Sequence, residues 1–209
     1  MSLLFFQQRK KYIPFLVFTL VVMVSCLPIQ PVKKPTENTS TDCELSWKKD
    51  KTDEAKELAF TISLNKHQYK PDDVILSTLS LRNQGATHIW VNERMIVNDP
   101  SPEDQGDVYF VILAPWSETA HLMALVDAMG KPETQNFVML APGETTEKVS
   151  EDIMYYSFSS LPDQVLSLGY PVGKYCAWAV YHNQTNPGLD GLVWKGKIKS
   201  NFVEFEITE

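Results

Sequence analysis

The 209-residue sequence lacks the short motifs that mark the common catalytic sites. It has no Gly-x-Ser-x-Gly nucleophile elbow, no His-Glu-x-x-His zinc motif and no glycine-rich loop of the kind that cradles phosphate. It has only four histidines, and their spacing is too wide for local zinc ligands: His67, His88, His121 and His182. These absences predict a protein that is not an enzyme and that carries no cofactor and no metal ion.

The sequence also lacks an excess of basic charge. Lys and Arg total 19 against 26 Asp and Glu, which gives a formal net charge of −7. A net negative field disfavours nucleic acid as a partner, so we expect none. Four acids lie in one turn segment and offer the oxygen ligands that calcium favours: Asp99, Glu103, Asp104 and Asp107. Their order is not that of a calcium-binding loop, so we expect a solvated acidic loop.

Long apolar runs are absent except for one near the start of the chain, at residues 12–25. This run follows the basic cluster Arg9-Lys10-Lys11 and is shorter than the roughly 20 residues that a spanning helix needs. A charged segment followed by a short apolar one is the layout of a secretory signal peptide. The run ends in Met23-Val24-Ser25-Cys26, which resembles the signal of bacterial lipoproteins.

The resemblance to a lipoprotein signal implies that the chain is cut before Cys26 and that this cysteine is lipid-modified. Two or three acyl chains would hold the protein on a membrane without a spanning helix, because each buried methylene contributes about 0.8 kcal/mol. The implied localisation is the bacterial cell envelope, on the outer membrane or the cell surface. The alternative is a retained signal anchor in which Cys26 is unmodified.

The chain divides into three predicted parts. Residues 1–25 are the signal peptide, and residues 26–42 are rich in Pro, Thr, Ser, Asn and Lys, which is typical of a flexible, disordered tether. Residues 43–209 are expected to form one folded domain, since 44% of the chain is hydrophobic and 22% charged. The lysine-rich stretches 47–51 and 194–197 are predicted to be solvated strand faces.

The domain is predicted to consist of short strands. In the first of them, residues 57–64, apolar side chains alternate from Leu58 to Leu64, which indicates a strand with one buried face. Further β-branched and aromatic runs between Gly, Pro and Asn turns predict strands at 74–81, 88–91, 108–113, 121–126, 137–140, 175–181 and 202–207. The segment 117–129 also fits a helix closed by Gly130, but its β neighbours favour a strand. The predicted fold class is all-β, an antiparallel β-sandwich.

Three motifs stand in the second half of the chain: Leu140-Ala141-Pro142-Gly143-Glu144, then Gly173-Lys174-Tyr175, and then Trp194-Lys195-Gly196 continuing to Ser200-Asn201. Together they resemble the bacterial extracellular immunoglobulin-like or fibronectin-III-like domains, over about residues 55–209. The resemblance implies an immunoglobulin-like β-sandwich with Tyr175 at a tyrosine corner, but it says little about activity. The inward position after Tyr175 is Ala177 rather than Cys, so the antibody-type bridge between sheets is absent.

If Cys26 is lipid-modified, two of the three cysteines remain, Cys43 and Cys176. Thiols oxidise outside the cytosol, so we expect a disulfide that joins the first strand to a late strand. In the chain-entropy model, closing so long a loop stabilises the fold by roughly 4–5 kcal/mol. The alternative is a pair of buried free thiols.

Aromatic residues in loops are the candidate ligand contacts, because binding sandwiches usually present Trp or Tyr there. These candidates are Trp116, Tyr155 and Tyr156, whereas Trp90, Trp178 and Trp194 are expected to pack within strands. The sequence therefore predicts a non-enzymatic, lipid-anchored cell-envelope protein whose sandwich binds a protein or glycan partner or serves in envelope assembly. The alternatives are a hydrolase whose site forms only in three dimensions and a protease inhibitor.

Overall fold

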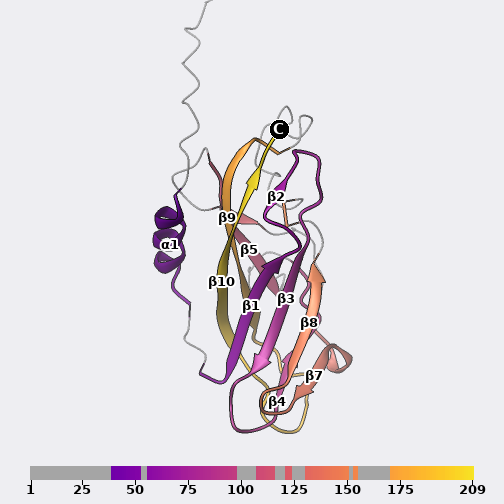
Figure 1. Cartoon of the computed structure of the whole chain (residues 1–209). Coiled ribbons are helices and arrows are strands. Elements are labelled where there is room, and N and C mark those ends of the chain that lie inside the picture. The colour runs from indigo at the N-terminus through magenta and orange to yellow at the C-terminus, as the bar shows by residue number, and fades with distance from the viewer. Residues whose placement is uncertain are drawn as a thin grey trace, which may run out of the picture. The chain divides into compact units, whose positions relative to one another are not determined.

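The computed structural model describes residues 39–52, 56–97, 107–115, 121–123, 130–150, 153–154 and 170–209. All of them belong to one compact unit, Lys34–Glu209. This part of the chain is all-β apart from one α-helix and one turn of 3-10 helix (Figure 1). The helices are α1 (Ser40–Lys49) and η1 (Thr134–Asn136), and the strands are β1 (Leu58–Leu64), β2 (Gln68–Tyr69), β3 (Ser77–Asn83), β4 (Ile89–Asn92), β5 (Val108–Leu113), β6 (His121–Met123), β7 (Phe137–Leu140), β8 (Thr145–Ser150), β9 (Gly173–Asn183) and β10 (Gly196–Ile207).

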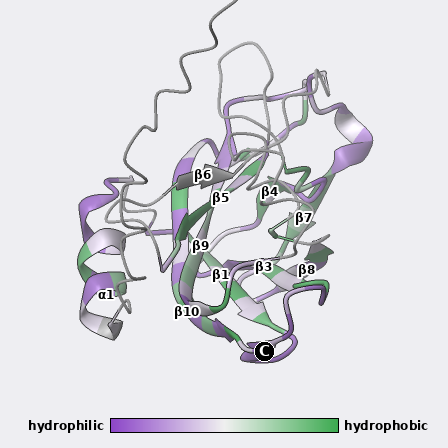
Figure 2. Ribbon diagram, turned by 90° about the horizontal axis from the view of Figure 1, so that it is seen from above, coloured by the Kyte–Doolittle hydropathy of each residue, from purple (hydrophilic) through white to green (hydrophobic). Residues whose placement is uncertain are grey.

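The strands form three sheets. One has the antiparallel order β1-β3-β8. A five-stranded sheet has the order β2-β10-β9-β5-β6 and is antiparallel except for the parallel pair of β2 and β10. The strands β4 and β7 pair with each other as a small third sheet. Figure 2 shows β9 and β10 between α1 on one side and β3 and β8 on the other.

The main hydrophobic core lies between the three-stranded and five-stranded sheets. β1 contributes its alternate residues from Leu58 to Ile62, and β9 contributes its alternate residues from Tyr175 to Tyr181. Side chains at every second position of a strand point to the same face, so each sheet presents one apolar face to the other. The alternation that predicted β1 is therefore the alternation that builds the core.

The outer face of β5 and β9 is buried as well. Their remaining residues, from Tyr109 to Leu113 and from Cys176 to Val180, form a second apolar cluster with Cys43 and, at its margin, Trp47. Cys43 and Trp47 come from α1, so the helix covers this face. Because β5 is buried on both faces, its sequence is an unbroken apolar run rather than an alternating one.

The helix α1 begins at a capping box. The Thr39 hydroxyl accepts a hydrogen bond from the Asp42 N–H at 3.4 Å, and the Asp42 carboxylate accepts one from the Thr39 N–H at 2.9 Å. The bond from the Thr39 backbone is the main cause that lowers the pKa of Asp42. Cys43 and Trp47 lie one turn apart and point to the sheet, whereas Glu44 and Lys48 pair at 2.6 Å on the exposed side.

A β-bulge in β10 connects the two large sheets. The register with β9 shifts just before Phe202, which leaves Asn201 free to turn toward β1. There the Ile62 N–H donates to Asn201 Oδ1 at 3.0 Å, and Asn201 Nδ2 donates to the Ile62 carbonyl at 3.0 Å. The neighbouring Ser200 hydroxyl accepts from the Ala179 N–H at 2.9 Å. The Ser-Asn pair of the third motif therefore ties β10 to both β1 and β9.

Most of the predicted strands are confirmed. The bounds of β5 and β7 are those predicted, and β1, β3, β4 and β9 differ from prediction by a few residues. The strand β6 occupies 121–123, and the rest of the predicted strand to 126 lies outside the described residues. The strands β2 and β8 were not predicted, since β2 has two residues and β8 is mostly exposed and polar.

The prediction is wrong for the segment that forms α1. Residues 47–49 are helical rather than part of a strand face, and Cys43 lies in this helix rather than in a first strand. The helix also begins at Ser40, within the residues assigned to the tether. The prediction failed because only Cys43 and Trp47 lie on the buried side of the helix, so the sequence lacks the apolar repeat that marks most helices. No helix in the described ranges is long and apolar enough to cross a membrane.

Candidate functional site

Three strands end in a buried asparagine whose side chain fixes the turn that follows. Asn83 ends β3, Asn92 ends β4 and Asn183 ends β9. In each case the side-chain oxygen accepts a hydrogen bond from the N–H two residues later, at 2.9, 3.0 and 3.2 Å respectively. Asparagine suits this position because its short amide bonds readily to nearby backbone. The strand therefore holds the beginning of the connection that follows it.

Two of these asparagines also bind backbone carbonyls of neighbouring segments. Asn83 Nδ2 donates to the carbonyls of Thr87 at 2.8 Å and Leu140 at 2.9 Å. Asn183 Nδ2 donates to the Trp194 carbonyl at 2.7 Å. Each amide thus joins the end of its strand to another segment of the chain. These buried bonds keep the connections close to the sheets.

Three connections meet beside β4 and β7, at the end of the strands far from the C terminus (Figure 1). They are residues 84–88, 141–144 and 184–195, and we call them the loop end. The 141–144 turn is bound to β3 by backbone hydrogen bonds from Gly143 to Asn83 at 2.8 Å and from Asn83 to Glu144 at 2.9 Å. Gly143 has a φ of 82°, which side-chain-bearing residues rarely adopt.

An apolar patch is exposed at the loop end. Trp90 in β4 lies directly opposite Met139 in β7 and forms a parallel bridge with Val193. Side chains at paired positions point to the same face, so these three form a row. Met139 is 48% exposed, Trp90 is half-buried, and the adjacent Leu192 is 47% exposed. We call Trp90, Met139 and Leu192 the Trp90 patch, and the neighbouring Val193 is buried, with 8% exposure.

The Trp90 side chain is held at its edge. Its indole N–H donates to the Asp190 carbonyl at 3.0 Å. Its backbone N–H donates to the Leu192 carbonyl at 2.8 Å, and its carbonyl accepts from Trp194 at 2.9 Å. An aromatic ring that is already fixed loses little conformational entropy when a partner covers it. The geometry is therefore that of a preorganised contact residue.

A buried ion pair supports the strand that carries Trp90. Asp107 is 1% exposed and accepts hydrogen bonds from Arg94 Nε and Asn92 Nδ2, both at 2.6 Å. The Tyr181 hydroxyl joins the network, since it accepts from the Asn92 N–H at 2.9 Å and donates to the Asn92 carbonyl at 3.1 Å. Met95, within this segment, has a φ of 43°, a left-handed conformation that is costly for a residue with a side chain. The network therefore holds a strained turn in place.

This network corrects the prediction of a solvated acidic loop. Asp107 is buried because its carboxylate is neutralised by Arg94 and accepts a further bond from the Ile96 N–H at 3.1 Å. Its position directly before the buried strand β5 was the available signal. The other acids of that segment, Asp99, Glu103 and Asp104, lie outside the described residues.

Burial favours the uncharged form of several titratable groups of the five-stranded sheet. It raises the pKa of Tyr109 to about 12 and raises the pKa of Tyr175 and Tyr181 well above the ordinary value. Burial, and then the nearby Lys197, lowers the pKa of His182. A neutral imidazole is therefore the form at pH 7. None of these groups lies in the Trp90 patch.

Cys43 and Cys176 form a disulfide on the outer face of the five-stranded sheet. Their Cα atoms are 6.0 Å apart, within the usual range for a bridge, and 133 positions separate them in the chain. Cys176 belongs to the outer apolar cluster, whereas Ala177 belongs to the core between the sheets. The bridge therefore joins α1 to β9 and does not connect one sheet to the other.

The remaining predicted site residues lie outside the described part of the chain: Cys26, Trp116, Tyr155 and Tyr156. Within the described part, no three His, Cys, Asp or Glu side chains are grouped so that they could hold a metal ion. Trp178 and Trp194 are buried, as expected of packing residues, whereas Trp47 and Trp90 are half-buried, and Trp47 packs against the outer apolar cluster. Comparison of the chain with models of protein families gave no match, and neither did comparison with curated proteins.

Proposed function

We propose that this is a non-enzymatic, lipid-anchored protein of the bacterial cell envelope that binds a protein partner through the Trp90 patch. The observation that carries the proposal is the row formed by the half-buried Trp90 and the exposed Met139, on an end of the domain fixed by buried asparagines. Trp and Met are enriched in protein interfaces, and Trp is prominent among the residues that carry most of the binding energy. Exposed polar residues beside the patch, His88 and Asp190, suit the rim of such an interface.

We infer that the two large sheets form an immunoglobulin-like sandwich. The orders β10-β9-β5 and β1-β3-β8 support this, because they correspond to strands G-F-C and A-B-E of that fold. The Tyr175 hydroxyl donates to the Pro171 carbonyl at 2.5 Å, which is the bond of a tyrosine corner. The connections after β3 and β9 then correspond to the B–C and F–G loops. Variable domains bind their ligands with this end of the sandwich.

The disulfide supports export. Disulfides persist in oxidising compartments, and residues 1–26 resemble a signal for transfer to one. Lipid on Cys26 would also remove the third thiol, which could otherwise compete with Cys43 for Cys176. Export, lipid attachment and bridge formation are therefore mutually compatible.

Lipid anchoring is tested by mass spectrometry of protein recovered from the membrane fraction of the producing cells. We expect a chain that starts at an acylated Cys26. A C26A variant should keep its fold, because Cys26 lies before the folded unit, and should carry no acyl mass. An intact leader with an unmodified Cys26 would overturn the anchoring proposal.

Partner binding is tested by crosslinking and pull-down from intact envelopes with wild-type protein, W90A and V149A. Val149 is the matched control, since it is 62% exposed and lies in β8, outside the Trp90 patch. We expect V149A to recover the same partner as the wild type and W90A to bind about 30-fold more weakly, which corresponds to about 2 kcal/mol. Equal recovery with W90A would contradict the proposal. Loss of binding after glycosidase treatment would indicate a glycan ligand instead.

A further inference from the structure

We infer that Met139 is a modification site, at which a peroxide oxidises the sulfur and thereby weakens partner binding through the Trp90 patch. The effect on binding rests on the proposed function, whereas the oxidation itself does not. Met139 is the sulfur-bearing member of the patch and is 48% exposed. Its position opposite Trp90 and its contrast with the other described methionines carry the inference.

Met139 and Trp90 form a non-hydrogen-bonded pair of the antiparallel strands β4 and β7. The Trp90 N–H donates to the Leu192 carbonyl at 2.8 Å, and the Trp90 carbonyl accepts from the Trp194 N–H at 2.9 Å, so both groups are directed away from β7. At a pair of this kind the Cα atoms are only about 4.5 Å apart, and the side chains are closer than at the hydrogen-bonded pairs. The Met139 sulfur is therefore within reach of the indole ring, in the row that the partner is proposed to cover.

Exposure separates Met139 from the other methionines whose side chains the structure describes. Met95 is 2% exposed and Met154 is 1% exposed, and both belong to the core between the sheets. A peroxide must reach a sulfur atom to react with it, so a buried methionine is oxidised only when the fold opens. The side chains of Met123 and Met129 lie outside the described part of the chain. Among the described methionines, Met139 is therefore the one that reacts in the folded protein.

The chemical step is a two-electron oxidation of the thioether. One oxygen atom passes from the peroxide to the Met139 sulfur, the O–O bond breaks, and an alcohol or water is released. The product is methionine sulfoxide, which is polar where the thioether was apolar. Methionine sulfoxide reductases reverse the step: the oxygen leaves as water while a dithiol is oxidised to a disulfide.

A sulfoxide at position 139 places a polar S–O group in an apolar row. A partner that covers Trp90 and Leu192 removes water from this group, and burial of a polar group without a hydrogen bond is costly. We therefore expect about tenfold weaker binding after oxidation. The fold itself should be little affected, since the Met139 side chain is exposed.

Peptide mapping of the purified, folded protein after dilute hydrogen peroxide tests the modification without a partner. The treated protein is unfolded, reduced and cleaved after glutamate, so that each described methionine lies in a peptide of its own: 94–103 for Met95, 134–144 for Met139 and 152–204 for Met154. We expect Met139 to gain the mass of one oxygen atom at least about tenfold faster than the two buried methionines. Equal rates, or faster oxidation of a buried methionine, would overturn the inference.

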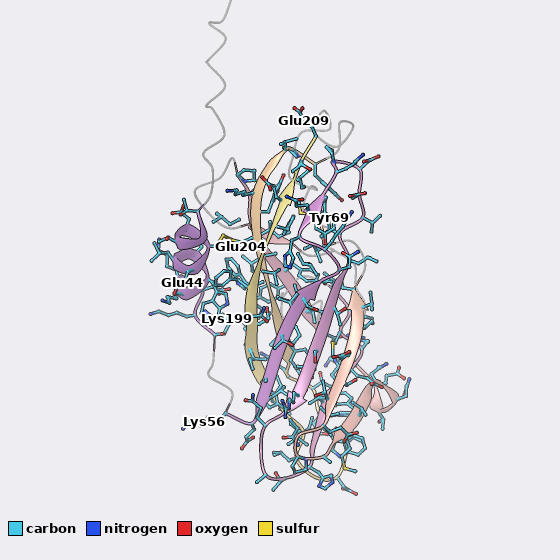
Figure 3. The ribbon with its side chains drawn as sticks, viewed as in Figure 1. Glu44, Lys56, Tyr69, Lys199, Glu204 and Glu209 are labelled. Carbon is cyan, nitrogen blue, oxygen red and sulfur yellow. A yellow bond between two sulfur atoms is a disulfide. The ribbon has the colours of Figure 1, made fainter. Side chains whose placement is uncertain are left out.

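Recovery of the partner from untreated envelopes tests the effect on binding. The protein carries a tag at its C terminus, since Figure 3 shows Glu209 at the end of the strands opposite to that where Figure 1 places β4 and β7. Catalase destroys the peroxide before the protein meets the envelopes. We expect the wild type to bind about tenfold more weakly after oxidation than before. M139L is the matched control, because it has no sulfur at this position, and its own binding should be the same before and after oxidation.

The outcomes separate this inference from the proposed function. Undiminished binding by wild-type protein whose Met139 is oxidised would overturn the inference, and so would an equal loss of binding by oxidised M139L. Failure of the proposed function appears before any oxidant is added, as equal binding by wild type and W90A. It would remove the effect on binding, whereas the peptide map decides the modification site independently.

Discussion

Removal of the Cys43–Cys176 bridge should take away a large share of the stability of this protein. The bridge closes a loop between positions 133 apart, for which the chain-entropy model gives about 5 kcal/mol at 25 °C. The net stability of a domain is about 5–15 kcal/mol. We therefore expect C43A/C176A to be folded only marginally, with a melting temperature about 10–20 °C below that of the wild type.

Urea unfolding followed by circular dichroism measures this loss directly. The matched control is C26A, which removes a cysteine outside the bridge and should leave the free energy of unfolding unchanged. Wild-type protein unfolded in reductant should approach the stability of the double variant, because its bridge opens too. A loss below about 1 kcal/mol for C43A/C176A would refute the reasoning, since that is the size of an ordinary substitution. In that case the bridge would be absent, and alkylation of the unreduced, unfolded wild-type protein should label both Cys43 and Cys176.

Two further predictions follow from the buried groups. D107A should lower the free energy of unfolding by about 3–5 kcal/mol, because the Arg94 guanidinium loses its buried carboxylate partner. Urea denaturation of D107A measures this loss, with the exposed-site variant V149A as the control. Alkaline pH should unfold the protein. Tyrosines of the unfolded chain titrate near pH 10, whereas in the folded protein burial raises the pKa of Tyr109 to about 12 and also raises the pKa of Tyr175 and Tyr181. The unfolded state then binds fewer protons above pH 10, so stability falls as pH rises. Phenolate absorbance should appear together with loss of β circular dichroism, and full titration near pH 10 with the fold intact would contradict this.

The strands could be predicted from the sequence because one residue pattern decides each of them. Leu58 to Leu64 alternate since one face of β1 meets the core, and the unbroken run of β5 reflects burial on both faces. The cover on the outer face of β5 could not be predicted, because α1 has only Cys43 and Trp47 on its buried side. Its Thr39 and Asp42 capping box was a readable signal for the start of the helix.

The candidate site could not be assembled from sequence at all. Trp90, Met139 and Val193 are far apart along the chain, and only the pairing of β4 with β7 and with the segment after β9 brings them into one row. Trp90 alone could not be assigned from the sequence, since it stands with Ile89 and Val91 in an unbroken apolar run, which fits burial on both faces of a strand. Exposure at this position depends on what covers the sheet, which is a property of the whole fold.

Site-specific photo-crosslinking in intact cells tests the central claim most directly. A photoreactive side chain would be placed at position 139, within the Trp90 patch, and in a second variant at position 149, on β8. The account predicts a discrete crosslinked partner from Met139, none from Val149, and loss of the Met139 adduct when W90A is added. No adduct from Met139, or equal adducts from both positions, would contradict it.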